Sequence, residues 1–80
     1  MRKKIIMREK MIPQKNVVGT EENGDIDIDP RQTPREKLDS EIHELVHALW
    51  PEEPENLVRL KARKISKAMW RLNYRRVVEI

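Results

Sequence analysis

The sequence contains no cysteine and no phenylalanine, and it has only two glycines and two histidines among its 80 residues. Without cysteine the chain can form neither a disulfide scaffold nor a thiolate zinc site. No hydrophobic run approaches the length of a membrane-spanning helix. The apolar residues Ile5-Ile6-Met7 are followed at once by Arg8-Glu9-Lys10. We therefore expect no signal peptide, no membrane partner and a location in the cytoplasm.

The length of the chain limits what can hold the fold together. Residues 1–80 make one small domain, near the lower limit at which an apolar core alone stabilises a fold. A metal held by histidines and carboxylates, or association into a homo-oligomer, would supply further stability. Charged residues are 39% of the chain, but the net charge is only +3, which does not by itself indicate a nucleic-acid partner.

Residues 1–32 carry the signals of strands and turns. Residues 3–12 mix apolar and charged side chains and predict a strand at the edge of a sheet. Residues 19–24 read as a polar turn. Residues 25–29 alternate strictly between Asp and Ile, which predicts a half-buried strand with both isoleucines pointing inward.

The first of two expected helices covers residues 33–50. Thr33 as N-cap, Pro34 at the first helical position and Glu36 two residues later form a capping box. Pro51 disfavours helical geometry in the residue before it, so the helix should end there. Four residues at steps of four, three and four are expected to form its core face. They are Leu38, Ile42, Leu45 and Leu49.

The second expected helix covers residues 54–73, and residues 74–80 form a tail. Because the connection between the helices is short, we expect them to be antiparallel neighbours. The apolar face of the second helix is expected to consist of Leu57, Leu60, Ile65, Ala68, Met69 and Leu72. Of the two tryptophans, Trp50 is expected beside the candidate site and Trp70 under the tail.

The two histidines are the most informative residues of the chain. His43 and His47 stand four residues apart, and Glu44 follows the first, in the pattern His-Glu-x-x-His. Residues at i and i+4 share one helix face, so both imidazoles can reach one metal ion. In this pattern the histidines bind zinc and the glutamate acts on the metal-bound water as general base. Chance placement gives the spacing and the glutamate together in roughly 0.3% of arrangements, so the pattern predicts a metal site.

A catalytic zinc normally has three protein ligands and one open position. Since the chain has no third histidine and no cysteine, the third ligand must be an Asp or a Glu. Glu55 is the first candidate, because its carboxylate could turn back toward the histidines from the start of the second helix. Glu52 and then Glu53, both in the connecting turn, are the next candidates.

From about residue 24 to residue 76 the chain resembles the small zincin-like metallopeptidases encoded by bacteriophages and prophages. The segments that carry the resemblance are Ile28-Asp29-Pro30, His43 to Ala48, Trp50-Pro51, Glu55 to Val58 and Met69 to Arg75. The resemblance implies Zn²⁺ as cofactor, with His43, His47 and Glu55 as ligands and Glu44 as the catalytic base. It also implies a minimal zincin-like α+β domain, with one or two short antiparallel strands followed by two packed antiparallel helices.

Three functions follow from these patterns. The first is a zinc-dependent metallopeptidase or related hydrolase that acts on a peptide or protein substrate. The second is a non-catalytic phage accessory protein that binds a host protein in the host cytoplasm, with a structural or vestigial metal site. The third is nucleic-acid binding through the basic second helix, although no recognised DNA-binding motif is present. The basic residues concerned are Lys61, Arg63, Lys64, Lys67, Arg71, Arg75 and Arg76.

Overall fold

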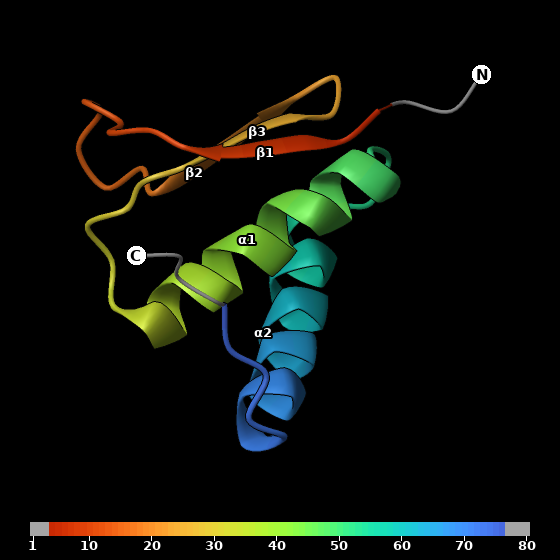
Figure 1. Ribbon diagram of the computed structural model, residues 1–80. Helices are drawn as coiled ribbons and strands as arrows, with labels where there is room; N and C mark the ends of the chain where they lie inside the picture. The colour runs from red at the N-terminus through yellow and green to blue at the C-terminus, as the bar shows by residue number, and fades with distance from the viewer. Residues whose placement is uncertain (1–3, 77–80) are drawn as a thin grey trace.

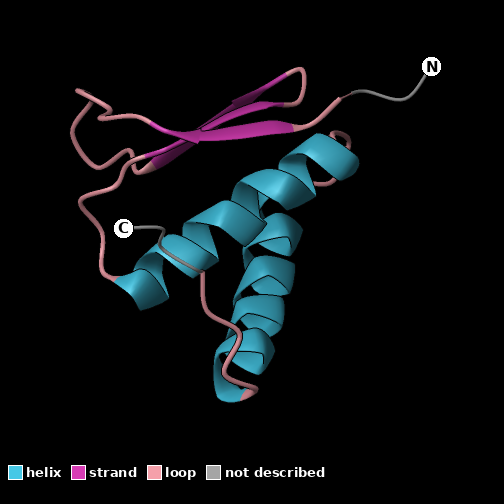
Figure 2. Cartoon of the chain, viewed as in Figure 1, coloured by secondary structure: helices cyan, strands magenta, loops and turns pink. Residues whose placement is uncertain are grey.

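The computed structural model of the chain describes residues 4–76, which form a small α+β domain (Figure 1). Three strands come first, β1 (Ile6–Glu9), β2 (Gly19–Glu22) and β3 (Asp25–Ile28). Two helices follow, α1 (Pro34–Leu49) and α2 (Glu55–Arg71). The order of strands and then two packed helices is the one that the sequence predicts (Figure 2). α1 lies between the sheet and α2, so it has a partner on two of its sides (Figure 1).

The sheet has the strand order β1-β3-β2 and contains one strand more than the sequence predicts. β3 is central, and its isoleucines Ile26 and Ile28 are fully buried, as their alternation with Asp predicts. β1 lies at an edge, as expected, but it pairs with β3 in the parallel sense, whereas β2 pairs with β3 antiparallel. The prediction of an antiparallel sheet is therefore correct for only one of the two pairings.

The prediction of a turn over residues 19–24 is wrong for the first four of them, which form β2. The turn itself is limited to Asn23 and Gly24, both of which have positive φ angles, 51° and 88°. A Cβ on Gly24 would lie 2.6 Å from the carbonyl oxygen of Lys4, so glycine is needed here. The side chains of β2 are polar and therefore do not indicate a strand in the sequence. An edge strand with one face in solvent needs few apolar residues.

α1 begins and ends where the capping signals place it. The N–H of Glu36 donates to Oγ1 of Thr33 at 3.2 Å, and the N–H of Thr33 donates to Oε1 of Glu36 at 3.0 Å. These two bonds form the predicted capping box and satisfy backbone donors that the helix leaves free. The helix ends at Leu49, two residues before Pro51.

The predicted core face of α1 is only partly correct, because the helix is covered on two sides. Ile42 and Val46 are buried against α2, while Ala48 is buried with the isoleucines of β3 against the sheet. Leu38 and Leu45 are partly buried and pack at the margins of these two clusters. Leu49, expected in the core, is 55% exposed.

The predicted apolar face of α2 is wrong except at Met69, which packs against the core. The buried residues are Val58, Ala62 and Ser66, at steps of four. Among the described elements, α2 contacts α1 and no strand. Only one narrow stripe of the surface of α2 is therefore buried. Small residues in that stripe let the two helices approach closely. The expected residues that are exposed instead are Leu57, Leu60, Ile65, Ala68 and Leu72.

Ser66 joins the two helices through a buried polar contact. Its Oγ donates to Oδ1 of Asp39 at 2.8 Å, and Nη1 of Arg35 donates to the same Oγ at 3.2 Å. Val58, early in α2, packs beside Val46, late in α1, whereas Ser66 meets Asp39 and Arg35 near the start of α1. The helices therefore run in opposite senses, as predicted.

Beyond α2, residues 74–76 have no regular structure, and the part of the expected tail at residues 77–80 lies outside the described residues. The guanidinium of Arg75 lies 3.4 Å from the ring centroid of Trp70, so that tryptophan is covered by the start of the tail. Trp50 is 53% exposed at the end of α1. Within residues 4–76, neither helix combines the length and the hydropathy that crossing a membrane requires.

Candidate metal centre

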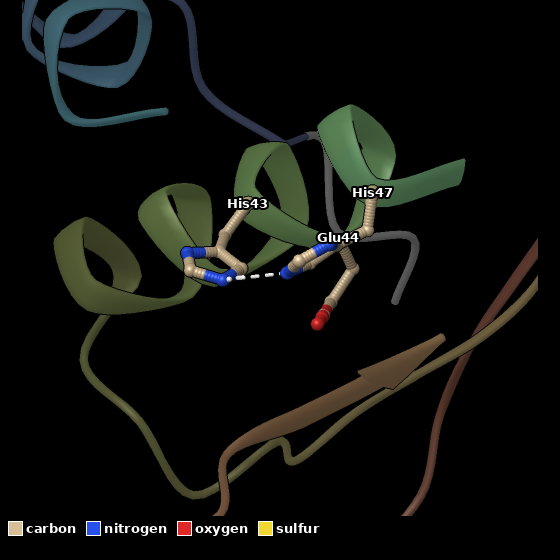
Figure 3. A group of neighbouring side chains, drawn as sticks. All are labelled: His43, Glu44 and His47. Atoms are coloured by element: carbon tan, nitrogen blue, oxygen red, sulfur yellow. Dashed lines mark hydrogen bonds between the residues drawn. The ribbon is translucent and has the colours of Figure 1, made fainter. Parts of the chain in front are cut away.

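α1 presents both histidines on one face, as their spacing predicts. The Nε2 atoms of His43 and His47 lie 3.2 Å apart, and their ring centroids lie 4.9 Å apart. Figure 3 shows the two imidazoles turned toward each other beneath the helix. The two Nε2 atoms therefore lie close enough to act as ligands of one ion.

Glu55, the first candidate for the third ligand, is the one that the fold brings to the histidines. Its Oε1 lies 2.9 Å from Nε2 of His43, and its Oε2 lies 2.8 Å from Nε2 of His47. The contact follows from the packing of the helices, because Glu55 precedes Val58 by three residues and shares the face of α2 that lies against α1. Glu53 instead forms an ion pair with Lys61, and Glu52 is exposed in the turn.

The three donor groups fit a small divalent cation. Donor atoms on a tetrahedral zinc with bonds of about 2.0–2.1 Å lie about 3.3 Å apart. The two Nε2 atoms lie 3.2 Å apart, and each lies 2.9 or 2.8 Å from a different oxygen of Glu55, so a small outward movement of the side chains would admit the ion. Imidazole and carboxylate are also ligand types that zinc accepts, although other divalent metals bind the same set. The cluster can therefore hold a metal ion.

Glu44 lies beside this cluster and is buried, with 7% of its surface exposed. One oxygen or nitrogen atom from each of His43, Glu44 and His47 lies within 4.8 Å of the others. Oε2 of Glu44 has no hydrogen-bond partner within the described residues. Burial raises the pKa of Glu44, the two imidazoles oppose that effect, and the charges of Glu55 and Glu21 add to it. A buried carboxylate with a free oxygen is suited to accept a proton.

Gly19 is a residue of the site that the sequence analysis missed. The Glu44 side chain turns toward the sheet (Figure 3), where it lies against Gly19 at the start of β2. A Cβ on Gly19 would lie 3.1 Å from Cγ of Glu44, so any larger residue here would press on the Glu44 side chain. The sequence carries no local signal for this contact, because it depends on how β2 crosses α1.

A cleft of about 280 Å³ opens beside the candidate metal centre. The cleft is lined by Asn16, Val17, Val18, Gly19, Asp39, Ser40, His43, Glu44, Glu55 and Arg59. Arg59 is the second residue that the sequence analysis missed, although its position four residues after Glu55 indicates that it shares a helix face with that glutamate. Nη2 of Arg59 lies 3.6 Å from Oε1 of Glu55. The cleft therefore joins the metal-binding cluster, the free carboxylate and one cation.

A larger cavity, of about 580 Å³, lies between the start of α1 and the end of α2. Leu38, Met69, Trp70 and Tyr74 contribute its apolar walls. None of the residues that line it belongs to the metal-binding cluster, so its size does not make it the candidate site.

No protein-family model, curated protein or solved structure matches this chain, so its function must be inferred from the geometry of the cluster itself.

Proposed function

We propose that the chain is a zinc-dependent metallopeptidase. The observation that carries the proposal is the meeting of His43, His47 and Glu55 donor atoms beside Glu44, a buried carboxylate with a free oxygen. Three protein ligands leave one position of a tetrahedral zinc open, which is typical of catalytic sites, whereas structural sites have four protein ligands. The resemblance to the phage and prophage metallopeptidases supports the same assignment and suggests action in the cytoplasm of a bacterial host.

Zinc bound there would act as a Lewis acid that polarises a substrate carbonyl and lowers the pKa of water. The role of Glu44 would be to accept a proton from the attacking water and to pass it to the leaving amine nitrogen. Burial raises the pKa of Glu44, which favours a carboxyl that holds this proton between the two steps. The packing of the Glu44 side chain against β2 limits the orientations that its carboxylate can adopt.

The open edge of β2 supports a peptide as the substrate. The N–H of Asp29 donates to the carbonyl oxygen of Val18 at 2.9 Å, and hydrogen-bonded pairs alternate along an antiparallel ladder. Gly19 and Glu21 therefore direct their backbone groups away from β3. Among the described strands, none pairs with this edge. An extended peptide could add to it as a further strand, directly beside Glu44.

A metal that only staples the fold is the second candidate. Glu55 belongs to α2 and the histidines belong to α1, so a shared ion would tie the two helices together in a chain that has no disulfide. This function needs no base, and it predicts that the wild type has no hydrolytic activity for a replacement of Glu44 to remove. The two candidates therefore differ in what they predict for Glu44.

The decisive experiment combines metal content and turnover. Elemental analysis of protein purified without chelator should give one zinc per chain, lost in His47→Ala and Glu55→Ala but kept in the control Glu52→Ala. Wild-type protein should hydrolyse a casein-type substrate, and Glu44→Gln should keep its zinc but lose activity by about 10²-fold or more. Hydrolysis that survives in Glu44→Gln would contradict the mechanism. Bound zinc, without turnover on any peptide library, would favour the staple.

A further inference from the structure

We infer that the cleft beside the metal site selects substrates with a carboxylate on the C-terminal side of the scissile bond, and that Arg59 binds this carboxylate. The inference rests on the proposed function and adds a substrate class to it. It starts from the position of Arg59 on α2, four residues after Glu55 and on the wall of the cleft.

Arg59 has hydrogen-bond donors to spare. A guanidinium has five N–H donors, and the contact of Arg59 with Glu55 is a single one, at 3.6 Å. Its side chain is 65% exposed and Arg59 lines the cleft, so the remaining donors are open to solvent and accessible to a ligand bound there. Among the described residues that line the cleft, Arg59 is the one permanent cation. It is thus the residue there that can bind an anionic group with two parallel hydrogen bonds.

Two of the three acidic residues that line the cleft contact other polar groups, and the third is buried. Asp39 accepts the hydroxyl hydrogen of Ser66, Glu44 is buried against β2, and Glu55 is turned to the imidazoles. A divalent ion at the cluster would further offset the charge of Glu55. The guanidinium would then face the cleft without a full counter-charge, which favours an anionic ligand.

The direction of β2 fixes which end of a peptide enters the cleft. β2 runs from Gly19 to Glu22, and the cleft lies at its beginning, where residues 16–19 form one wall. A peptide that adds antiparallel, the slightly more stable arrangement, places its C-terminal part at that end. A cleft of about 280 Å³ is small for a ligand pocket, so it suits a short group. The carboxylate is either the terminus of the substrate or an Asp or Glu side chain after the cleaved bond.

The test uses two zinc-binding probes that differ in one group, succinic monohydroxamate and its carboxamide analogue. Each is titrated by calorimetry into zinc-loaded wild type, Arg59→Gln and the control Arg63→Gln, a change of the same charge one turn further along α2. Wild type and Arg63→Gln should bind the carboxylate probe about tenfold to a hundredfold more tightly than the carboxamide. In Arg59→Gln the two affinities should become equal, while the zinc content stays unchanged.

The remaining outcomes separate this inference from the proposed function. A wild type without zinc overturns both together. Zinc binding with equal affinity for the two probes overturns the inference alone. Loss of zinc in Arg59→Gln would show that Arg59 positions Glu55, and it would likewise overturn a role in binding substrate. Cleavage of peptides with a free or an amidated C-terminus, and with Glu after the cleaved bond, then identifies the source of the carboxylate.

Discussion

Glu44 of α1 packs against the backbone of Gly19 at the start of β2, at the point where a side chain on residue 19 would lie 3.1 Å from Cγ of Glu44. The same Cβ would lie 3.3 Å from Cδ1 of Ile28 in the buried layer. Because Gly19 has no side chain, the candidate base Glu44 can pack directly against the backbone of β2. Its orientation depends on the sheet as well as on its own helix.

The first prediction concerns Gly19→Ala. The added methyl group must displace the Glu44 side chain by a few tenths of an ångström, and small misplacements of catalytic groups lower rates strongly. We expect at least a tenfold loss of kcat with zinc content unchanged, measured beside Thr20→Ala, which changes an exposed neighbour on the same strand. Full activity in Gly19→Ala would show that the contact does not position Glu44.

Metal binding should stabilise the fold, because the ion links residues of two helices. At a free zinc concentration of about 100 times Kd, linkage gives about 2.7 kcal/mol of added free energy of unfolding. For a domain of this size, that corresponds to a rise in Tm of about 10–20 °C. Differential scanning calorimetry with zinc and with chelator measures the effect. Glu55→Gln should remove most of the rise, whereas an equal rise in that variant would exclude Glu55 as a ligand.

The contact of Ser66 with Asp39 predicts a cost for its removal. Ser66→Ala leaves Oδ1 of Asp39 without its hydrogen-bond donor at the helix interface and should lower the free energy of unfolding by about 1–3 kcal/mol. Urea denaturation followed by circular dichroism measures this loss. Lys67→Ala, an exposed change one residue further on, is the control and should stay close to wild type. Equal stability of the two variants would mean that water replaces the serine at no cost.

Stability should also fall in acid because of Asp29, which is only 3% exposed. The side chain of Arg31, together with the backbone N–H groups of Ile12 and Arg31, holds the pKa of Asp29 well below its usual value of 3.8. A carboxyl whose pKa is lower in the folded state stabilises the protein fully above the unfolded pKa. That stabilisation is lost as the pH falls through the lower, folded pKa.

The measurement is Tm between about pH 2 and about pH 7 for wild type, Asp29→Asn and the control Asp25→Asn. Asp29→Asn should be less stable than wild type at neutral pH, and the difference should shrink below about pH 4, where the Asp29 carboxyl of the unfolded wild type becomes protonated while that of the folded state is still ionised. Asp25→Asn changes an exposed acid of β3, four residues earlier, and should follow the wild-type curve. A constant difference between Asp29→Asn and wild type at every pH would contradict the prediction.

The sequence predicts α1 and the histidine pair well because their signals are local. The capping box at Thr33 and the i, i+4 spacing of His43 and His47 act within one or two helical turns, and both appear in the structure. Glu55, the first of the three candidate acids, lies against both histidines, and its role as a ligand stays a prediction. The turn after α1 is short and Glu55 lies at the start of α2, so the Glu55 carboxylate can reach few places other than the end of α1.

The errors come from contacts between segments far apart in sequence. The polar sequence of β2 predicts a turn, because its identity as a strand depends on pairing with β3. The apolar residues of α2 predict a broad core face, yet the helix packs through Val58, Ala62 and Ser66, since close approach to α1 favours small residues. Hydrophobicity alone does not distinguish a helix buried on a narrow stripe from one buried on a broad face.

The narrow stripe of α2 has a consequence for the ion itself. Ala62 is fully buried where the helices touch, and it acts as a spacer that sets how far α2 stands from α1. A larger side chain at this position would carry Glu55 away from the imidazoles, and a wider opening would favour cations of larger ionic radius over zinc. Under the proposed function, the choice of metal would therefore depend partly on a methyl group seven residues along α2 from Glu55.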